Sequence, residues 1–537
     1  MKGKSALMAG VAAIALVATT QAGFAAKKGS DGTSAAPAAA AAPTGPSNEE
    51  LAARVQALED ELQADETKSV ADHGRLSALE QNFNYTTWTF DNGRPVVNSG
   101  DGRFSLAFRV RFQFDNAQFM QDSVAKLTAN APKASMDLGS GAVIRRGFFG
   151  VEGKAFSDFW YEFRLNAGGS DGGNNGASGV PNAGEGDPLM SLARVAYVGI
   201  DHFMINFGVI EPALMFEGTT SSGQLMFMER PEIDNIAADS FGAADSRRGI
   251  EVRYQKDSAL MPGDNLVLNV AFTGNKTGST AGHGVGGDEQ AQLLDRVSYR
   301  FWNDGPSNAS VGFSNSNILY SGNAAGGGSQ TIRLRDRPEI RVDGTRLIDT
   351  GGIAAKTGTM FAFDGGVNFE NFFLGGEWAQ FQVDRLKSGT LAADHPTFSG
   401  YYLEASWVLT GEPKSYTVSA TNNEVGGFGA PKVANPFSLK GDSWGAWELT
   451  ARYSDTNLNW NPTTAATSTT QAGINGGDER VIALGLNWYL NNEVKLQVND
   501  LITSVKKFST TARGVSGNAN VGSQDFNTIG VRLQFSN

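Results

Sequence analysis

One stretch near residue 105 alternates apolar and polar side chains with almost complete regularity. Its apolar residues are Phe104, Leu106, Phe108, Val110, Phe112 and Phe114, and between them stand Arg103, Ser105, Ala107, Arg109, Arg111 and Gln113. Because successive side chains of a β-strand point to opposite faces, one face gathers the aromatic rings and the other gathers three arginines. A soluble sandwich seldom has aromatic rings at almost every outward position. The pattern predicts a strand that separates lipid from a water-filled lumen.

The same alternation returns along the chain as far as its last residues. It is clearest in residues 159–166, 296–301, 447–453 and 483–488. Short polar turns such as Asn491-Asn492 follow some alternating segments, whereas long Gly-rich connections such as 168–189 follow others. Short turns at one end and long loops at the other are typical of outer-membrane barrels. We therefore predict an all-β fold, a transmembrane antiparallel β-barrel that occupies residues 84–537.

The segment Thr331–Arg341 decides the predicted number of strands. About seventeen segments could be strands, but bacterial barrels of this kind have an even number. Thr331–Arg341 contains Pro338, which cannot donate a hydrogen bond to a closed ladder. We therefore expect about 16 strands, with this arginine-rich segment forming a long loop that bends into the pore.

The composition limits the classes of function. Only 19% of the 537 residues are charged, 66 are Gly and none is Cys, which suits one large β domain without disulfides or thiolate metal sites. The formal net charge of −12 argues against a nucleic-acid partner. The 4 histidines lie far apart in the sequence, with no paired spacing for zinc. We predict no enzymatic activity, no metal and no cofactor.

The N-terminal residues predict export. Lys2 and Lys4 precede an apolar run that is too short to span a membrane, so residues 1–25 are predicted to be a secretory signal peptide. Residues 26–48 are rich in Ala and Pro and predict a flexible spacer. An exported barrel of this kind belongs in the bacterial outer membrane, in contact with its lipid.

Residues 49–83 follow a heptad pattern. Leu51, Val55, Leu58 and Leu62 are spaced 4-3-4, and Leu76, Leu79 and Phe83 resume the register after a polar break at Asp65, Ser69 and Asp72. This predicts a periplasmic coiled coil that is interrupted in its middle and associates as a homotrimer. An amphipathic helix packed on its own domain is the alternative. The helix could also contact the cell wall.

Alternation assigns most of the basic side chains to the lumen. The predicted anion-binding residues are Arg103, Arg109, Arg111, Arg146, Arg164, Arg253, Arg296, Arg300, Arg452, Lys495 and Arg532, against the inward acids Glu152, Glu162, Glu251, Asp364 and Glu448. The same alternation puts Arg145 on the opposite face. A guanidinium stays charged and offers a planar fork of donors, which suits phosphate and carboxylate groups. The alternative is that these arginines pair with the acids across neighbouring strands and only stiffen the wall.

The segment from Glu211 to Arg247 is the candidate constriction. It carries Phe216, Leu225, Met226, Phe227 and Met228, which are too apolar for a solvated loop. We expect the segment to pack against the inside of the wall and narrow the channel. Glu229 and Arg230 either face the aperture or form a salt bridge that fastens the loop, and both interpretations stay open.

The sequence resembles the phosphate-selective porin O/P family over residues 100–537. The matching segments are, in order, the first alternating strand, Arg145-Arg146 leading to 150–154 (GVEGK), 227–230 (FMER), 400–402 (GYY), 409–412 (LTGE), 445–449 (GAWEL) with 452–454 (RYS), 485–489 (GLNWY) and 532–535 (RLQF). The resemblance implies a sixteen-stranded trimeric porin whose third loop folds into the lumen. It also implies basic side chains that draw anions, typically phosphate, through a constriction, and a periplasmic extension before the barrel.

Pattern and resemblance together predict an outer-membrane porin for passive diffusion of small inorganic anions, with phosphate the first candidate, through an arginine-lined lumen. A general or sugar-admitting porin is the nearest alternative. A third hypothesis makes the protein a tether between outer membrane and cell wall, with the barrel as its anchor.

Overall fold

The computed structural model describes residues 47–91, 93–121, 138–169, 190–277, 287–322, 331–387, 393–418, 425–462, 473–507 and 522–537. The chain separates into two compact units, residues 1–76 and 77–537. The predicted signal peptide, residues 1–25, lies outside the described residues, and so does the predicted spacer up to residue 46.

A single long helix, α1 (Asn48–Asn84), makes up most of the described part of the first unit. It begins with Glu49 and Glu50 in its first turn, where acidic groups favour a helix N-terminus. Its residues up to 80 are exposed, the heptad residues included. The helix is continuous for 37 residues and runs through the polar break at Asp65, Ser69 and Asp72. Neither described helix is long and apolar enough to cross a membrane.

A small hairpin precedes the barrel. It consists of β1 (Thr87–Asp91) and β2 (Arg94–Asn98), which pair in antiparallel fashion. The ring of wall strands begins with β3 at Ser105, and β2 pairs with its first residues.

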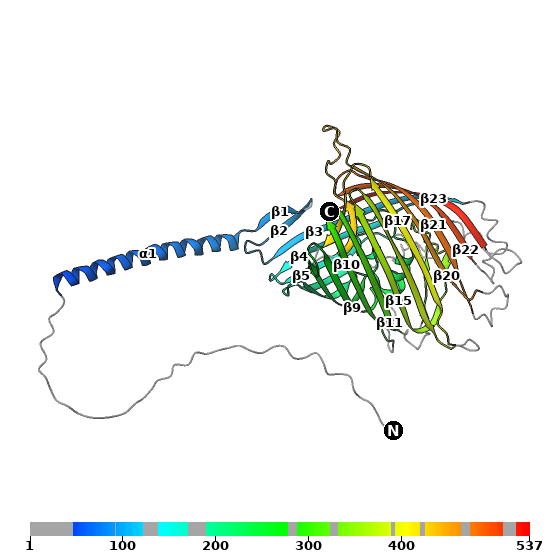
Figure 1. The fold of residues 1–537 in the computed structure, drawn as a ribbon, viewed down its shortest axis with the longest axis horizontal. Coiled ribbons are helices and arrows are strands. Elements are labelled where there is room, and N and C mark those ends of the chain that lie inside the picture. Colours follow the sequence, from blue (N-terminus) through cyan, green and yellow to red (C-terminus); the bar gives the residue numbers. More distant parts are fainter. Residues whose placement is uncertain are drawn as a thin grey trace, which may run out of the picture. The chain divides into compact units, whose positions relative to one another are not determined.

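The second unit is a closed antiparallel barrel of 16 strands (Figure 1). In order, the wall strands are β3 (Ser105–Gln121), β4 (Gly141–Ala155), β5 (Phe159–Asn166), β6 (Met190–Tyr197), β7 (Phe203–Ile210), β8 (Arg247–Asp257), β9 (Asn265–Lys276), β10 (Ala291–Asp304), β11 (Ser307–Tyr320), β15 (Ile353–Phe369), β16 (Phe372–Arg385), β17 (Thr397–Val408), β20 (Ala446–Trp460), β21 (Ile474–Tyr489), β22 (Val494–Lys507) and β23 (Gly522–Ser536). Each pairs with its neighbours, and β23 pairs with β3 to close the ring. The predicted fold class and strand number are confirmed.

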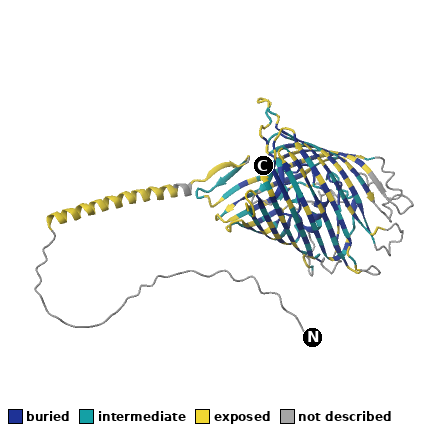
Figure 2. Ribbon diagram, viewed as in Figure 1, coloured by how far each residue is buried: buried dark blue, intermediate teal, exposed yellow. Residues whose placement is uncertain are grey.

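The wall separates two kinds of side chain, as the alternation predicts. On β3, Phe108 and Phe114 are 46% and 42% exposed on the outer face, whereas Gln113 and Asp115 on the inner face are fully buried. Buried and exposed residues alternate along the other strands too (Figure 2). Backbone groups in lipid must be hydrogen-bonded within the protein, and a closed ladder satisfies them while the outer side chains meet hydrocarbon.

One irregularity changes a predicted face. The register between β3 and β4 shifts between Gln113, which pairs with Arg146, and Phe114, which pairs with Ile144. The extra residue, Arg145, forms a β-bulge, and both arginines turn inward with 3% and 6% exposure. The predicted outward position of Arg145 is therefore wrong, because simple alternation does not hold across a bulge.

Three connections fold into the barrel and fill much of it. The β7–β8 loop, residues 211–246, carries a short 3-10 helix, η3 (Glu217–Thr219), and α2 (Glu232–Phe241). The β11–β15 connection carries β12 (Thr331–Ile332), β13 (Arg335–Asp336) and β14 (Ile348–Asp349). The β17–β20 connection carries the hairpin of β18 (Lys414–Val418) and β19 (Val425–Pro431). Their apolar residues join inward wall residues in one buried cluster.

The β17–β20 connection enters from the end of the barrel where most connections are short, which we call the turn end. The β7–β8 and β11–β15 connections enter from the opposite end, the loop end. Only the first two residues of Thr331–Arg341, β12, pair with a wall strand, β15. The rest of the segment lies outside the wall ladder and contains buried residues such as Leu334, Arg337 and Ile340, as expected for a loop bent into the pore.

A buried ion pair joins the two strands that close the barrel. Arg532 on β23 and Asp115 on β3 are direct partners in the ladder, with Nε and Nη2 lying 2.6 and 2.7 Å from the two carboxylate oxygens. Both side chains are fully buried. A charge-assisted, bidentate pair of this kind fixes both groups, but removing one partner leaves the other charge buried.

Asp115→Ala is expected to lower the free energy of unfolding by about 3 kcal/mol, measured by urea unfolding in lipid vesicles. Asp525→Ala, at an exposed position of β23, is the control and should change little. The double variant Asp115→Ala/Arg532→Met should recover most of the loss, because the buried guanidinium is removed with its carboxylate partner and Glu229, its other partner, keeps Arg145. A double variant as unstable as the single one would contradict this account.

Candidate functional site

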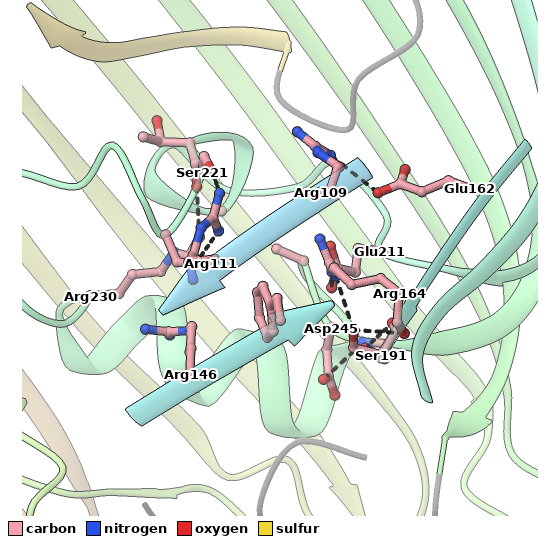
Figure 3. Close-up of a pocket in the computed structure, with 16 residues that line it drawn as sticks. Arg109, Arg111, Arg146, Glu162, Arg164, Ser191, Glu211, Ser221, Arg230 and Asp245 are labelled. Atoms are coloured by element: carbon pink, nitrogen blue, oxygen red, sulfur yellow. Dashed lines mark hydrogen bonds and ion pairs between the residues drawn. The ribbon is translucent and has the colours of Figure 1, made fainter. Parts of the chain in front are cut away.

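A cavity of about 100 Å³ lies between the β7–β8 loop and the wall formed by β3–β6 (Figure 3). Five arginines line it, namely Arg109, Arg111, Arg146, Arg164 and Arg230, together with the acids Glu162, Glu211 and Asp245 and a group of serine and threonine hydroxyls. Five arginines against three acids give the lining a net charge of +2. Four of the five arginines come from the rigid wall, and Arg230 comes from the loop.

Arg111 joins the wall to the loop through neutral groups. Its Nη2 and Nη1 donate to the hydroxyls of Ser221 and Ser222, each at 2.7 Å. Its Nε donates to Ser536 Oγ at 3.1 Å. A Cβ on Gly223 would come within 3.1 Å of the guanidinium, so a larger residue there would push against it. These contacts fix the guanidinium beside the cavity.

Arg109 is held by acids on the neighbouring strands. Its Nε lies 3.3 Å from Glu152 and its Nη1 lies 3.2 Å from Glu162. Glu162 also accepts from Arg194 at 2.8 Å, so one carboxylate serves two guanidinium groups. For Arg109 the structure therefore shows the cross-strand pairing that was the alternative to anion binding, although its side chain keeps 21% exposure.

An aromatic ring lies between two of the lining arginines. The guanidinium of Arg164 is 4.7 Å from the centroid of Phe148, and that of Arg111 is 5.6 Å away. Arg164 also forms an ion pair with Glu211 and donates to Ser191 Oγ at 2.9 Å. The negative face of the ring favours both cations and so eases their mutual repulsion.

The fifth arginine, Arg230, belongs to the β7–β8 loop and is held by carbonyl oxygens of the same loop. Arg230 donates to the carbonyl oxygens of Glu217 at 2.9 Å and Thr220 at 2.7 Å. Arg146, on the wall, donates to Gln113 Oε1 at 2.8 Å. Arg230 is thus positioned by backbone carbonyl oxygens, whereas Arg146 has both a neutral acceptor and the carboxylate of Glu229, 3.6 Å away.

A second cavity, of about 300 Å³, adjoins the first and lies toward the turn end. The two cavities share Arg109, Arg111 and Ser221 in their linings. The second also has Arg94, Lys432 and Lys495, against one acidic side chain, Glu493. Basic groups therefore continue from the inner cavity to the turn end, with the Arg109–Arg111 pair at the boundary.

Other predicted lining residues take different positions. Arg253, Arg296, Arg452 and Arg532 line neither cavity and lie in buried ion pairs with Glu251, Asp364, Glu339 and Asp115. Arg300 lies 4.8 Å from the ring centroid of Tyr416. Arg103 lies in the turn before β3 and pairs with Asp101. The structure thus divides the predicted set into groups beside the cavities and groups inside the packed interior.

The β7–β8 loop is fastened by a buried carboxylate. Glu229 lies 2.8 Å from both Arg145 Nε and Arg532 Nη2, and Arg146 and Arg341 lie within 3.7 Å. Burial alone would raise the pKa of Glu229, but the surrounding guanidinium groups outweigh it and hold the pKa well below its usual value. Of the two interpretations of Glu229, the structure shows the fastening salt bridge.

The apolar part of the loop packs as predicted. Phe227 is 1% exposed and its ring centroid lies 4.4 Å from the guanidinium of Arg452, while Met226 and Met228 are equally buried. The loop therefore covers one part of the lumen and leaves the arginine-lined cavity beside β3–β6.

Sequence reasoning missed several groups that line the cavities. Ser221 and Ser222 belong to the run 219–222 (TTSS), whose hydroxyls could have indicated a polar contact in an otherwise apolar loop. Arg94 and Lys432 lie in segments that alternation does not cover. In the described part of the chain, no group of three or more His, Asp or Glu side chains could hold a metal ion.

The chain was compared with known proteins. It is 23% identical to porin O of Pseudomonas aeruginosa over 458 residues, covering 82% of this chain and 90% of that protein. It is 24% identical to an uncharacterized protein of Caulobacter vibrioides over 421 residues, covering 77% and 70%. The outer membrane channel DcaP of Acinetobacter baumannii aligns in structure over 81% of this chain and 97% of its own, with 11% identity and a TM-score of 0.43.

The family model described as phosphate-selective porin O and P matches residues 117–536. The match spans nearly the whole wall, from the middle of β3 to the end of β23. The chain belongs to this family and is an outer-membrane β-barrel porin.

Proposed function

We propose that this porin admits small anions, with phosphate the first candidate, along the basic passage beside β3–β6. The observation that carries the proposal is the pair of adjoining cavities whose linings share Arg109 and Arg111 and have more basic than acidic side chains. The description of the matching family as phosphate-selective supports the same substrate class.

The arrangement suits passage as well as binding. A guanidinium offers donors in a plane that matches two oxygens of a phosphate or carboxylate, and it remains charged at any physiological pH. Conduction requires several sites that each release the ion readily. Glu162 and Glu211 lie beside Arg109 and Arg164 and reduce the attraction at each of these sites, while Arg94 and Lys495 extend the basic lining toward the turn end.

The loop fastened by Glu229 is proposed to be the constriction. It enters from the loop end, packs its apolar side against the wall and presents Arg230 and Ser221 to the cavity. The position of the loop then sets the cross-section of the passage beside β3. The carboxylate of Glu229 holds the loop in this position and so determines the conductance.

We further propose a homotrimer held partly by α1 acting as a periplasmic coiled coil, after removal of the signal peptide and with residues 26–48 as a spacer. The support is a helix of 37 residues whose apolar heptad residues, including Leu58 and Leu62, are 64% and 68% exposed. Exposed apolar groups at heptad spacing are stabilised by association of helices. A tether to the cell wall remains the second candidate for this helix.

Arg109→Glu combined with Arg111→Glu is expected to lower the chloride-to-potassium permeability ratio at least tenfold, because it makes the lining net negative. The measurement is the reversal potential of the purified porin in a planar bilayer under a salt gradient. Phosphate added to chloride should block the wild type and have little effect on the variant.

Arg480→Glu is the control, because Arg480 is exposed on the outer face of β21 and lines neither cavity. Arg145, which alternation put on the outer face, is unsuitable as a control because it pairs with Glu229 and fastens the loop. A wild type indifferent to the sign of the ion would favour a general or sugar-admitting porin.

Glu229→Gln should give a larger and noisier single-channel conductance at pH 7, because the loop loses the charge that holds it. A carboxylate with a lowered pKa keeps its contribution above its ordinary pKa and loses it only as the pH falls through the lowered value. Wild-type conductance should therefore stay constant from about pH 8 to about pH 5. Glu289→Gln, at an exposed residue of another loop-end connection, is the control. A larger and noisier conductance of the wild type already at pH 5 would refute the role of Glu229.

Leu58→Asp combined with Leu62→Asp should weaken the trimer, measured by light scattering in detergent, and leave single-channel conductance unchanged. Gln56→Asp with Gln63→Asp adds the same charge to the same helix outside the apolar heptad positions and should leave the trimer intact. Equal weakening by both pairs would contradict the coiled coil.

A further inference from the structure

The β1–β2 hairpin continues the barrel wall beyond the end of β23. Ala107 of β3 pairs with Glu152 of β4 on one edge and with Val96 of β2 on the other. Farther along β3, from Arg111 to Gln121, this second edge pairs with β23. The hairpin therefore occupies the edge of β3 that β23 leaves unpaired at the turn end, where Figure 1 shows it beside β3.

The register fixes which face the hairpin aromatics share. Trp88 pairs with Val97, and Val97 pairs with Leu106. Directly paired residues of antiparallel strands put their side chains on the same face, so Trp88 lies on the outer face with Leu106. Phe90, two residues farther along the strand, shares that face. Thr89, through Val96 and the buried Ala107, lies on the opposite face, toward the lumen side.

The outer face of the hairpin is continuous with the lipid-facing surface of the wall. Leu106 is followed on the same face by Phe108 and Phe112, which are exposed outside the barrel. Trp88 and Phe90 are 68% and 78% exposed, more than these wall residues. Leaving two large aromatic rings in water is unfavourable, so their position next to a lipid-contacting surface indicates what covers them.

Aromatic side chains mark the turn end elsewhere around the barrel. Trp447 contacts Trp488 with centroids 5.0 Å apart, Phe372 contacts Trp407 at 5.5 Å and Phe159 contacts Tyr197 at 5.4 Å, all on outer faces. Trp and Tyr are enriched where membrane meets water, because they have an apolar body and a polar group. The strands β22, β23, β3 and β4 contain neither Trp nor Tyr. Trp88 supplies the Trp that these four strands lack.

We propose that the β1–β2 hairpin is a membrane-interface anchor, with Trp88 and Phe90 in the phospholipid headgroup layer at the turn end of the barrel. The hairpin then joins the N-terminal helix to the barrel through a segment fixed against the membrane. Arg103, half exposed in the turn between β2 and β3, lies where a basic group meets lipid phosphates.

Single cysteines test the proposal, because the chain has none of its own. The full-length porin with Phe90→Cys or Thr89→Cys is labelled with a nitroxide in vesicles of phosphatidylethanolamine and phosphatidylglycerol. Collision rates with oxygen, which concentrates in lipid, and with a water-soluble nickel chelate are measured by electron paramagnetic resonance. Both positions are exposed, so folding should be unaffected. Trp88→Cys repeats the measurement on the outer face.

Positions 88 and 90 are expected to collide more with oxygen than with the chelate, by severalfold, and position 89 to show the reverse. Greater collision with the chelate at all three positions would place the hairpin in water and overturn the proposal. Spin–spin broadening at positions 88 and 90 that disappears on dilution with unlabelled porin would also overturn it. That result would assign the face to contact between copies of this chain.

Discussion

Closure of the hydrogen-bonded ladder is the constraint on which the rest of this structure depends. Once β23 pairs with β3, every wall strand has two partners, and the backbone can cross a membrane without unsatisfied polar groups. Successive side chains of each wall strand then face the lipid and the lumen in turn. The apolar set is stabilised outside, and most charges on the wall have to be accommodated inside.

Inside the barrel, charge is accommodated in two ways. Where the inward connections fill the lumen, basic groups such as Arg452 and Arg532 are buried and lie against carboxylates, because an isolated charge in a packed interior is very costly. Beside β3–β6 the loop stands off the wall, and arginines there meet serines, carbonyl oxygens and a ring as well as acids. The second arrangement gives a cavity whose lining carries more basic than acidic side chains.

The β7–β8 loop connects the packed interior, where charges are paired, with the arginine-lined cavity. Glu229 binds Arg145 and Arg532 inside the packed region, while the next residue, Arg230, lines the cavity. The β-bulge is what brings Arg145 to the lumen beside Arg146, so a local irregularity of the wall supplies part of the anchor. The side of the loop that is packed against the wall thus fixes the position of the side that borders the cavity.

The sequence by itself determined the fold class, the inward face of most strands and the packing of the β7–β8 loop inside the barrel, because a side-chain period of two and a run of apolar loop residues are local properties. It also indicated that Thr331–Arg341 does not belong to the wall, through Pro338. Only the tertiary structure decided which arginines line a cavity. Whether Arg164 and Arg296 meet an open space or a buried acid depends on where three connections, distant in sequence, fold into the barrel. The face of Arg145 was likewise decided by the register between two strands, which no alternation within a single strand can reveal.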